Sequence, residues 1–445
     1  MRTSTDTIAA IATAPGAGGI GIVRLSGPRA RAIGETLAGS ALEPRRAAYR
    51  CFRNAAGDSI DDGIALYFQA PLSYTGEDVV ELQVHGSVPV LAQLLRACLA
   101  QGARTARPGE FTERAFLNDK LDLAQAEAVA DLIAAGSEAA ARAARRSLDG
   151  EFSRRVQEVL ERLTRLRVLV EAMLDFPEEG IDFLAPAHIH EGLTGTVAAL
   201  AQLRREAGRG LRLRNGLHAV IVGAPNTGKS SLLNALAAED RAIVAEIAGT
   251  TRDLLRETLD LEGVTLTLVD TAGLRDSTDI VEAEGIRRAR AELSRADLAL
   301  AVLDARDPEV PQVLAAALQG QPAVLWLHNK VDLASQSART ETHADGTHLW
   351  LSAKTGIGME ALRSALRKAA GVEGEGSFSA RARHVVALDE TSAALDRAQA
   401  RMAEGQGELA AEELRLGQRS LGEITGVLAA DDLLGRIFSD FCIGK

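Results

Sequence analysis

The residues best suited to chemistry lie at 223–230, where the sequence GAPNTGKS fits the pattern G-x-x-x-x-G-K-[ST]. In this pattern, backbone N–H groups surround nucleotide phosphates, the lysine contacts the β- and γ-phosphates, and the final hydroxyl ligates Mg²⁺. The apolar run 218–222 predicts a buried strand before the loop, and 231–236 predicts a helix after it. The alternative is an ordinary glycine-rich turn, which would not need a buried strand before it and a helix after it. We expect a phosphate site formed by Asn226, Thr227, Gly228, Lys229, Ser230 and Ser231, in which Ser230 ligates Mg²⁺.

Four shorter motifs follow in the order that a guanine-nucleotide switch requires. The first, 249–253, can supply a threonine hydroxyl to Mg²⁺, and the second, 270–273, can hold the ion through water and sense the γ-phosphate. In the third, NKVD at 329–332, the carboxylate can accept the N1–H and the exocyclic amino hydrogens of guanine, a donor pair that adenine lacks. The fourth, SAK at 352–354, would contact the base from the other side, and the set predicts GTP rather than ATP. The residues assigned to GTP here are Gly249, Thr250, Thr251, Asp270, Thr271, Ala272, Gly273, Asn329, Lys330, Asp332, Ser352, Ala353 and Lys354.

Leu274 follows the second motif, at the place where Ras-type switches carry a glutamine that orients the attacking water. Leucine cannot orient or polarise water, so either hydrolysis is very slow or another side chain supplies this function. Glu282 is near enough in the sequence to be that side chain. The alternative is that Glu282 only caps or solvates the helix expected to run to Ser294, and spacing alone does not separate the two.

Length and composition limit the class of protein. A chain of 445 residues predicts about three domains. The net charge of −11 argues against broad, nonspecific nucleic-acid binding, which needs a cationic surface. We find neither a transmembrane run nor the apolar core of a signal peptide. Three scattered cysteines, Cys51, Cys98 and Cys442, do not suggest a disulfide framework, so we expect a cytoplasmic protein.

The elements that must position these residues change character along the chain. Residues 1–118 predict a small α+β domain, with strands at 19–25, 64–68 and 79–84 and a helix at 88–100. Helical periodicity then fills 124–148, 152–173 and 188–207, and the glycines at 208 and 210 predict a break. Alternating strands and helices follow over 217–370, with short apolar strands at 265–269, 298–303 and 323–327 that suit a mainly parallel sheet. Residues 380–445 are again helical, so we expect one helical domain interrupted by a nucleotide-binding domain.

Longer motifs resemble the bacterial tRNA-modification GTPases of the MnmE (TrmE) family. The resemblance covers essentially the whole chain and rests on YTGED at 74–78, RPGEF at 107–111, FLNDKLDLAQAEA at 116–128 and FCIGK at 441–445. It implies a multidomain α/β and α fold. The implied parts are an α+β folate-binding and dimerisation domain (1–118), a helical domain in two pieces (119–212 and 377–445) and an inserted Ras-like P-loop G domain (213–376).

The resemblance also implies how the GTPase works. The family is activated by K⁺ and by dimerisation of its G domains, and its catalytic glutamate, which orients the attacking water, corresponds to Glu282. Thr251 would ligate Mg²⁺ beside Ser230. The implied K⁺ ligands are Asn226, Ala245, Ile247 and Thr250, and the implied GTP-binding segment adds Glu246 and Ala248.

The resemblance further implies folate chemistry in the N-terminal domain. The ligand would be 5-formyltetrahydrofolate or a related tetrahydrofolate, and the residues matching its contacts are Arg24, Glu81, Lys120 and Lys445. On sequence alone, surface charges would be the preferred interpretation of these four residues. The chain departs from the family at Ala17, where many members carry an arginine, which puts any contact of that loop with the folate tail in doubt. A prenylation box fits Cys442 poorly, and whether this thiol is chemical or structural stays open.

The family acts as a homodimer with an FAD-dependent partner, MnmG. Together they add an aminomethyl or carboxymethylaminomethyl group at C5 of the wobble uridine (U34) of certain tRNAs, with a one-carbon unit from tetrahydrofolate. The alternative is a regulatory RNA-binding GTPase of ribosome assembly. Such proteins usually carry a basic RNA-binding module, whereas this chain is acidic and its flanking segment is helical.

Overall fold

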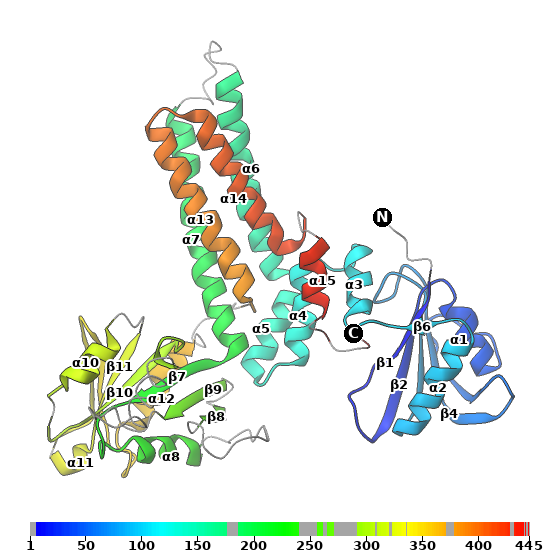
Figure 1. Ribbon diagram of the computed structural model, residues 1–445, viewed down its shortest axis with the longest axis horizontal. Coiled ribbons are helices and arrows are strands. Elements are labelled where there is room, and N and C mark those ends of the chain that lie inside the picture. Colours follow the sequence, from blue (N-terminus) through cyan, green and yellow to red (C-terminus); the bar gives the residue numbers. More distant parts are fainter. Residues whose placement is uncertain are drawn as a thin grey trace, which may run out of the picture. The chain divides into compact units, whose positions relative to one another are not determined.

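A computed structural model describes residues 6–175, 186–239, 256–260, 265–270, 292–307, 309–319, 323–334, 336–370, 378–427, 431–439, 441 and 444 (Figure 1). The chain divides into two compact units. The first combines Met1–Ala130, Ser153–Thr196 and Glu390–Lys445, and the second combines Asp131–Phe152 and Val197–Asp389. The units divide the helical segments between them, so the domain boundaries proposed from the sequence stay predictions.

The N-terminal part of the first unit is a six-stranded sheet with the order β3-β4-β5-β2-β1-β6. Its strands are β1 (Ile8–Ile11), β2 (Gly18–Ser26), β3 (Ala48–Arg53), β4 (Ser59–Phe68), β5 (Val79–Gly86) and β6 (Arg104–Thr105). Neighbouring strands are antiparallel except β1 and β6. The helices α1 (Ala30–Ala38) and α2 (Val88–Ala100) share one apolar core with the sheet. The α+β fold, its three predicted strands and the helix at 88–100 are confirmed.

Helices make up the rest of the first unit and part of the second. They are α3 (Glu110–Leu117), α4 (Leu123–Ile133), α5 (Glu138–Leu148), α6 (Glu151–Asp175), α7 (Pro186–Asn215), α13 (Ala382–Ala403), α14 (Gly407–Thr425) and α15 (Asp431–Ser439). The predicted helical run at 124–148 is two helices, because α5 has its own N-cap: the Ser137 hydroxyl accepts the Ala140 N–H at 3.2 Å. Polar contacts join α14 to its neighbours in the first unit. Gln418 donates to Thr164 of α6 at 3.0 Å, and the Thr391 hydroxyl of α13 donates to the Gly417 carbonyl at 3.3 Å.

The helix break predicted at 208–210 is wrong, since α7 continues to Asn215. At Gly210 an added Cβ would lie only 2.2 Å from the carbonyl oxygen of Phe378. The glycine therefore permits close packing of a neighbouring backbone segment on the helix, at the modest cost in helix propensity that glycine carries. Sequence periodicity could not reveal this use because the contact joins positions far apart in the chain.

The second unit contains a seven-stranded sheet with the order β12-β13-β11-β10-β7-β9-β8. Its elements are β7 (Leu217–Val222), α8 (Lys229–Glu239), β8 (Arg256–Asp260), β9 (Thr265–Asp270), β10 (Leu298–Asp304), α10 (Gln312–Leu318), β11 (Val324–Asn329), α11 (Val331–Ala334), β12 (Arg339–His343), β13 (Gly346–Trp350) and α12 (Met359–Ala370). The sheet is parallel except at its edges, where β8 and β12 run antiparallel to their neighbours. The predicted mainly parallel sheet is confirmed.

Strand β7 shows why this sheet must be covered on both faces. Leu217, Ala219 and Ile221 enter one apolar core, with residues of α8 and α12. Val220 and Val222 enter a second core, which includes Leu314 and Leu318 of α10. A strand buried on both faces reads as a continuous apolar run, as this one does. The construction leaves the carboxyl ends of the parallel strands as the place for polar loops. Among the residues that the structure describes, no helix is long and apolar enough to cross a membrane.

Candidate nucleotide site

The loop at 223–228 connects the end of β7 to the start of α8, as the sequence predicts. Its backbone takes positive φ angles, which glycine and asparagine tolerate best: Asn226 has φ +64° and Gly228 has φ +97°. Space is short as well. An added Cβ would lie 2.3 Å from Val302 O at Gly223 and 2.3 Å from Asn329 Nδ2 at Gly228. The two glycines of the motif are thus required by contacts within the fold, before any nucleotide binds.

Lys229 is buried against this loop. Its ammonium donates hydrogen bonds to the carbonyl oxygens of Gly223 and Ala224, each at 3.0 Å. The side chain therefore lies over the same backbone that would surround a phosphate, and a phosphate can draw on the same cationic donor. Ser230 and Ser231 follow in the first turn of α8, and both are exposed. An exposed hydroxyl at this position can serve as a ligand for Mg²⁺.

Asn329 joins three of the predicted motifs. This side chain is buried at the end of β11, where its amide nitrogen donates to Thr227 O at 2.9 Å and its amide oxygen accepts the Ala353 N–H at 3.0 Å. One amide thus ties the phosphate loop to the segment 352–354. Amides have both a donor and an acceptor, which is why an asparagine can make this double bridge.

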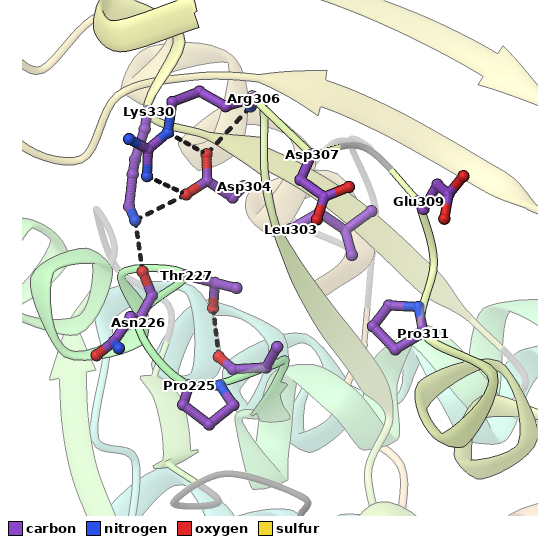
Figure 2. Close-up of a pocket in the computed structure, with 11 residues that line it drawn as sticks. Pro225, Asn226, Thr227, Leu303, Asp304, Arg306, Asp307, Glu309, Pro311 and Lys330 are labelled. Atoms are coloured by element: carbon purple, nitrogen blue, oxygen red, sulfur yellow. Dashed lines mark hydrogen bonds and ion pairs between the residues drawn. The ribbon is translucent and has the colours of Figure 1, made fainter.

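Lys330 makes a second link to the phosphate loop (Figure 2). Its ammonium donates to the carbonyl oxygen of Asn226 and forms an ion pair with Asp304 at 2.9 Å. Arg306 also contacts Asp304, with Nη2 at 2.8 Å from Oδ2. Hydrogen bonds from Arg306 and Lys330 hold the pKa of Asp304 far below its usual range, despite partial burial. Asp304 therefore stays ionised at neutral pH.

A cavity of about 480 Å³ lies beside this ion pair. Its lining comes from the phosphate loop, from the end of β10 and the loop after it, and from Lys330 (Figure 2). The lining residues are Ala224, Pro225, Asn226, Thr227, Leu303, Asp304, Arg306, Asp307, Glu309, Pro311 and Lys330. The lining combines charged side chains of both signs with four apolar residues, Ala224, Pro225, Leu303 and Pro311.

The remaining base-contacting candidates lie at the same end of the sheet. Asp332 is exposed in the first turn of α11, and Lys354 is exposed after the buried Ser352 and Ala353. The structure therefore gathers the phosphate loop, NKVD and 352–354 around one region, with Asn329 at its centre. Asp304 and Arg306 were not foreseen from the sequence. The signal for Asp304 was the one that marks Asp270, an aspartate directly after an apolar strand.

The N-terminal unit brings together part of the proposed folate site. Arg24 and Glu81 lie opposite each other on β2 and β5, with Arg24 Nε at 3.0 Å from Glu81 Oε1. Arg24 also donates to the carbonyl oxygen of Gly444 at 3.3 Å, so this residue of the C-terminal motif lies at the pair. The rings of Phe111 and Tyr74 lie 5.8 and 6.0 Å from its guanidinium carbon. Lys120 instead donates to Pro71 O at 3.1 Å and is not joined to the pair by these contacts.

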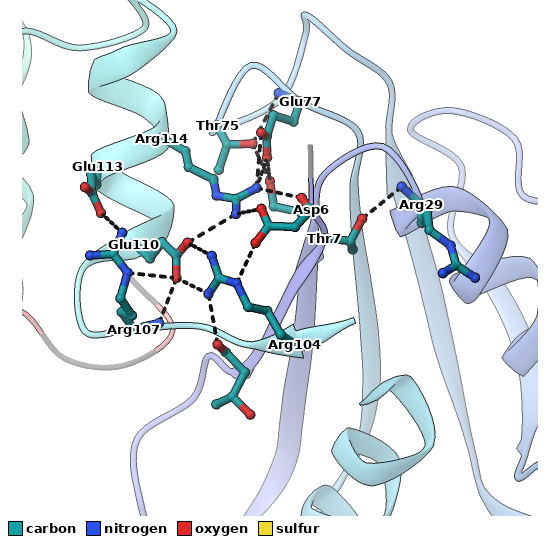
Figure 3. Close-up of polar contacts among 12 residues, drawn as sticks. Asp6, Thr7, Arg29, Thr75, Glu77, Arg104, Arg107, Glu110, Glu113 and Arg114 are labelled. Atoms are coloured by element: carbon teal, nitrogen blue, oxygen red, sulfur yellow. Dashed lines mark hydrogen bonds and ion pairs between the residues drawn. The ribbon is translucent and has the colours of Figure 1, made fainter. Parts of the chain in front are cut away.

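A cluster of charged residues lies in the same unit (Figure 3). Arg114 is buried and contacts Asp6 at 2.8 Å, Glu77 at 3.0 Å and Glu110 at 3.1 Å. Arg104 forms a second ion pair with Glu110. Glu77 and Glu110 belong to the motifs 74–78 and 107–111, so each of these motifs supplies a carboxylate to the cluster. The sequence did not single out this cluster.

Family profiles and full-length relatives match this chain along its length. The family profile described as "MnmE helical domain" matches residues 123–442, and that described as "GTP-binding protein TrmE N-terminus" matches residues 7–120. The tRNA modification GTPase MnmE of Xanthomonas campestris pv. campestris (strain B100) is 59% identical over 450 residues, covering 100% of both chains. The protein of the same name from Xylella fastidiosa (strain 9a5c) is 55% identical over 445 residues, covering 99% of this chain and 98% of its own.

The chain belongs to the MnmE (TrmE) family. Among solved structures, the G domain of the T. maritima FeoB iron transporter is 24% identical with a TM-score of 0.28, covering 35% of this chain and 98% of its own. The membership agrees with the expectation drawn from the motifs. It rests on the two profiles and on the full-length relatives.

Several residues proposed for the MnmE-family site lie outside the part of the chain that the structure describes. They are Ala245, Glu246, Ile247, Ala248, Gly249, Thr250, Thr251, Thr271, Ala272, Gly273, Leu274, Glu282, Cys442 and Lys445. Asp270 is described only as the last residue of β9. The roles of these residues stay predictions. The described part of the proposed site consists of the phosphate loop, Lys229, Ser230, the motif 329–332 and the segment 352–354.

Proposed function

We propose that this chain is a GTP hydrolase that works in tRNA modification. The observation that supports this most directly is the double bridge of Asn329, which holds the phosphate loop and the 352–354 segment on one amide. The full-length relatives are named tRNA modification GTPase MnmE, and this name agrees with the GTP specificity expected from Asp332. GTP is the substrate, and Ser230 with Thr251 would hold Mg²⁺.

We further propose that hydrolysis depends on K⁺. Of the four proposed ligands, Asn226 lies in the described part of the chain, where its side chain is exposed on the phosphate loop. Its amide oxygen is the hard donor that an alkali cation prefers. When bound beside the phosphates, K⁺ would offset the charge that develops during phosphoryl transfer. Glu282 would then orient the water that Leu274 cannot.

The wider reaction is proposed from the family. The chain would act in the cytoplasm as a homodimer with the FAD-dependent MnmG and a tetrahydrofolate. The pair would add an aminomethyl or carboxymethylaminomethyl group at C5 of U34 in certain tRNAs. The pairing of Arg24 with Glu81 and the Gly444 carbonyl supports a polar ligand site at that point. Arg24 could pair with a carboxylate of the ligand, and Glu81 could accept hydrogens from the amino edge of a pterin.

The test combines turnover with product analysis. GTP hydrolysis is measured in KCl and in NaCl of equal ionic strength, and equal rates would refute the K⁺ proposal.

Glu282→Ala should bind GTP normally and hydrolyse it at least about 100-fold more slowly, because general-base catalysis typically contributes that much. Glu284→Ala changes the same residue type two positions farther along the chain; it is the matched control and should keep wild-type turnover.

The tRNA role is tested in a strain from which the gene is deleted. Loss of the modified wobble uridine in that strain, restored by the wild-type gene, is the expected result. Normal wobble uridine together with defective ribosomes would instead favour the alternative, a GTPase of ribosome assembly.

A further inference from the structure

The end of β10 holds a carboxylate between two nucleotide motifs. In the sheet, β10 lies between β7, which leads into the phosphate loop, and β11, which leads into Asn329 and Lys330. Asp304 is the last residue of β10 and stands directly opposite Asn329 in the parallel register. Since the carboxyl ends of neighbouring parallel strands lie at one edge of the sheet, the topology fixes this carboxylate between the loops.

Asp304 is arranged to hold a lysine. The Asp304–Lys330 pair is largely protected from solvent, with side chains 17% and 23% exposed. Arg306 Nε lies 3.0 Å from Oδ1 and Nη2 lies 2.8 Å from Oδ2, which fixes the plane of the carboxylate. Oδ2 then receives Lys330 Nζ at 2.9 Å. A carboxylate oriented by a bidentate guanidinium holds its second partner in a defined direction.

Lys330 in turn holds the phosphate loop at its strained residue. Its ammonium donates to the carbonyl of Asn226, a residue with φ +64°. A non-glycine residue in the left-handed region costs free energy, and such a conformation persists only where surrounding contacts determine it. The contact from Lys330 is one of those that determine it. The chain of contacts therefore runs from Asp304 through Lys330 to Asn226.

We propose that Asp304 is a positioning residue of the nucleotide site, which aims Lys330 at the Asn226 carbonyl and thereby fixes the conformation of the phosphate loop. Two consequences follow. Nucleotide affinity depends on Asp304 although it belongs to none of the sequence motifs for GTP. The placement of the Asn226 amide depends on it too, and this second consequence rests on the proposed K⁺ function.

The experiment measures two quantities on the full chain. The dissociation constant of fluorescent mant-GDP is measured in NaCl, and the K⁺ concentration for half-maximal GTP turnover is measured in mixtures of KCl and NaCl. Asp304→Asn keeps the shape of the side chain and removes its charge. We expect mant-GDP affinity to fall about tenfold, as for loss of a charge-assisted hydrogen bond, and the K⁺ concentration to rise at least about threefold. Asp149→Asn, which alters an exposed pair with Arg145 in the same unit, is the control and should change neither quantity.

A double-mutant cycle separates positioning from general destabilisation. If Asp304 acts through Lys330, Asp304→Asn should add little to the loss of mant-GDP affinity caused by Lys330→Ala. Additive losses, or an Asp304→Asn protein that binds mant-GDP as tightly as the Asp149→Asn control, would overturn the proposal.

A second variant is used if Asp304→Asn lowers the melting temperature sharply. Asp304→Glu keeps the charge and should retain part of the mant-GDP affinity. A Glu variant that binds mant-GDP as weakly as the Asn variant would count against positioning. If the wild-type protein is not activated by K⁺, the proposed K⁺ dependence is refuted. The role of Asp304 in nucleotide affinity is still tested, because the mant-GDP dissociation constant is measured in NaCl.

Discussion

At the scale of single residues, the nucleotide site depends on a few positions with little steric freedom. Gly228 has no room for a side chain beside Asn329, and Lys330 as well as Asn226 takes a positive φ. The lack of space or the positive φ at these positions costs free energy in the folded chain, and each position makes a contact between two motifs. The pattern is typical of sites in which strain is maintained by the surrounding fold.

The residue proposed to recognise the base gives a prediction of affinity. Asp332→Asn replaces a carboxylate that would accept two guanine hydrogens by an amide that would accept one and present its own N–H. We expect GDP affinity to fall about 10- to 100-fold, because charge-assisted hydrogen bonds are lost. Xanthosine diphosphate, which has a carbonyl in place of the guanine amino group, should bind the variant better than it binds the wild type. Competition titrations with the two nucleotides measure this; unchanged GDP affinity would count against the assignment of Asp332.

At the scale of elements, neighbouring glycines in one helix have opposite roles. Both Gly208 and Gly210 lie inside α7, yet a Cβ at Gly208 would meet no atom within 4 Å, whereas at Gly210 it would meet the Phe378 carbonyl. The first glycine is only a weak helix former, and the second is a packing requirement.

This difference predicts opposite effects of one substitution. Gly208→Ala should raise the free energy of unfolding by up to about 1 kcal/mol, since alanine favours the helix. Gly210→Ala should lower it by about 2 kcal/mol or more, because the Cβ forces the Phe378 segment away. Urea denaturation of the two variants provides the measurement, with each acting as the control for the other. Equal effects would show that helix propensity alone governs both sites.

The charged cluster of the N-terminal unit predicts a dependence on pH. Burial alone would raise the pKa of Glu110, but hydrogen bonds from Arg104, from the Arg107 N–H and from Arg114 outweigh it and lower the pKa to about 2. A carboxylate with a depressed pKa stabilises the fold above its unfolded value, near 4.5, and loses that contribution as the pH falls toward 2. We expect about 1–2 kcal/mol to be lost across this window, a value reduced for the solvent exposure of Arg104.

Glu110→Gln tests this dependence. The variant should be less stable at pH 7 and should lose less of its remaining stability between pH 4.5 and pH 2 than the wild type does. Denaturation curves at several pH values provide the measurement. A variant whose stability fell in parallel with that of the wild type over this window would contradict the assignment to Glu110.

At the scale of the whole molecule, one buried carboxylate forms ion pairs where the chain enters the nucleotide-binding segment and where it leaves it. Asp131 Oδ1 accepts Arg214 Nε at 2.7 Å and Arg381 Nη2 at 2.7 Å. Arg214 lies at the end of α7, just before β7, and Arg381 lies just before α13. The chain therefore enters and leaves this segment at one ionic contact. The exit is held further by the stacked rings of Phe152 and Phe378, with centroids 4.7 Å apart.

Removal of this carboxylate should destabilise the second unit. Asp131→Asn leaves two arginines without their buried anion, and we expect a loss of about 2–3 kcal/mol, the lower end of the range for broken buried pairs, because the arginines are partly exposed. Asp389→Asn alters an exposed pair with Arg204 and should cost less than about 1 kcal/mol. Thermal and urea unfolding of both variants measure the difference. Equal losses would show that the Asp131 contact is no stronger than a surface pair.

The sequence by itself determined the local chemistry. The motif at 223–230, the apolar strands around it and the order of the later motifs predicted a guanine-nucleotide site on a mainly parallel sheet, because such loops and strands are specified by residues adjacent in the chain. Only the tertiary structure decided which distant residues share a contact. In the sequence, Gly210 predicts a helix break, and only the structure shows that the Phe378 backbone packs against it. In the sequence, Asp304 is only the end of a strand, and the strand order is what places it between β7 and β11. Such contacts depend on strand order and on close backbone approach, which local sequence patterns do not encode.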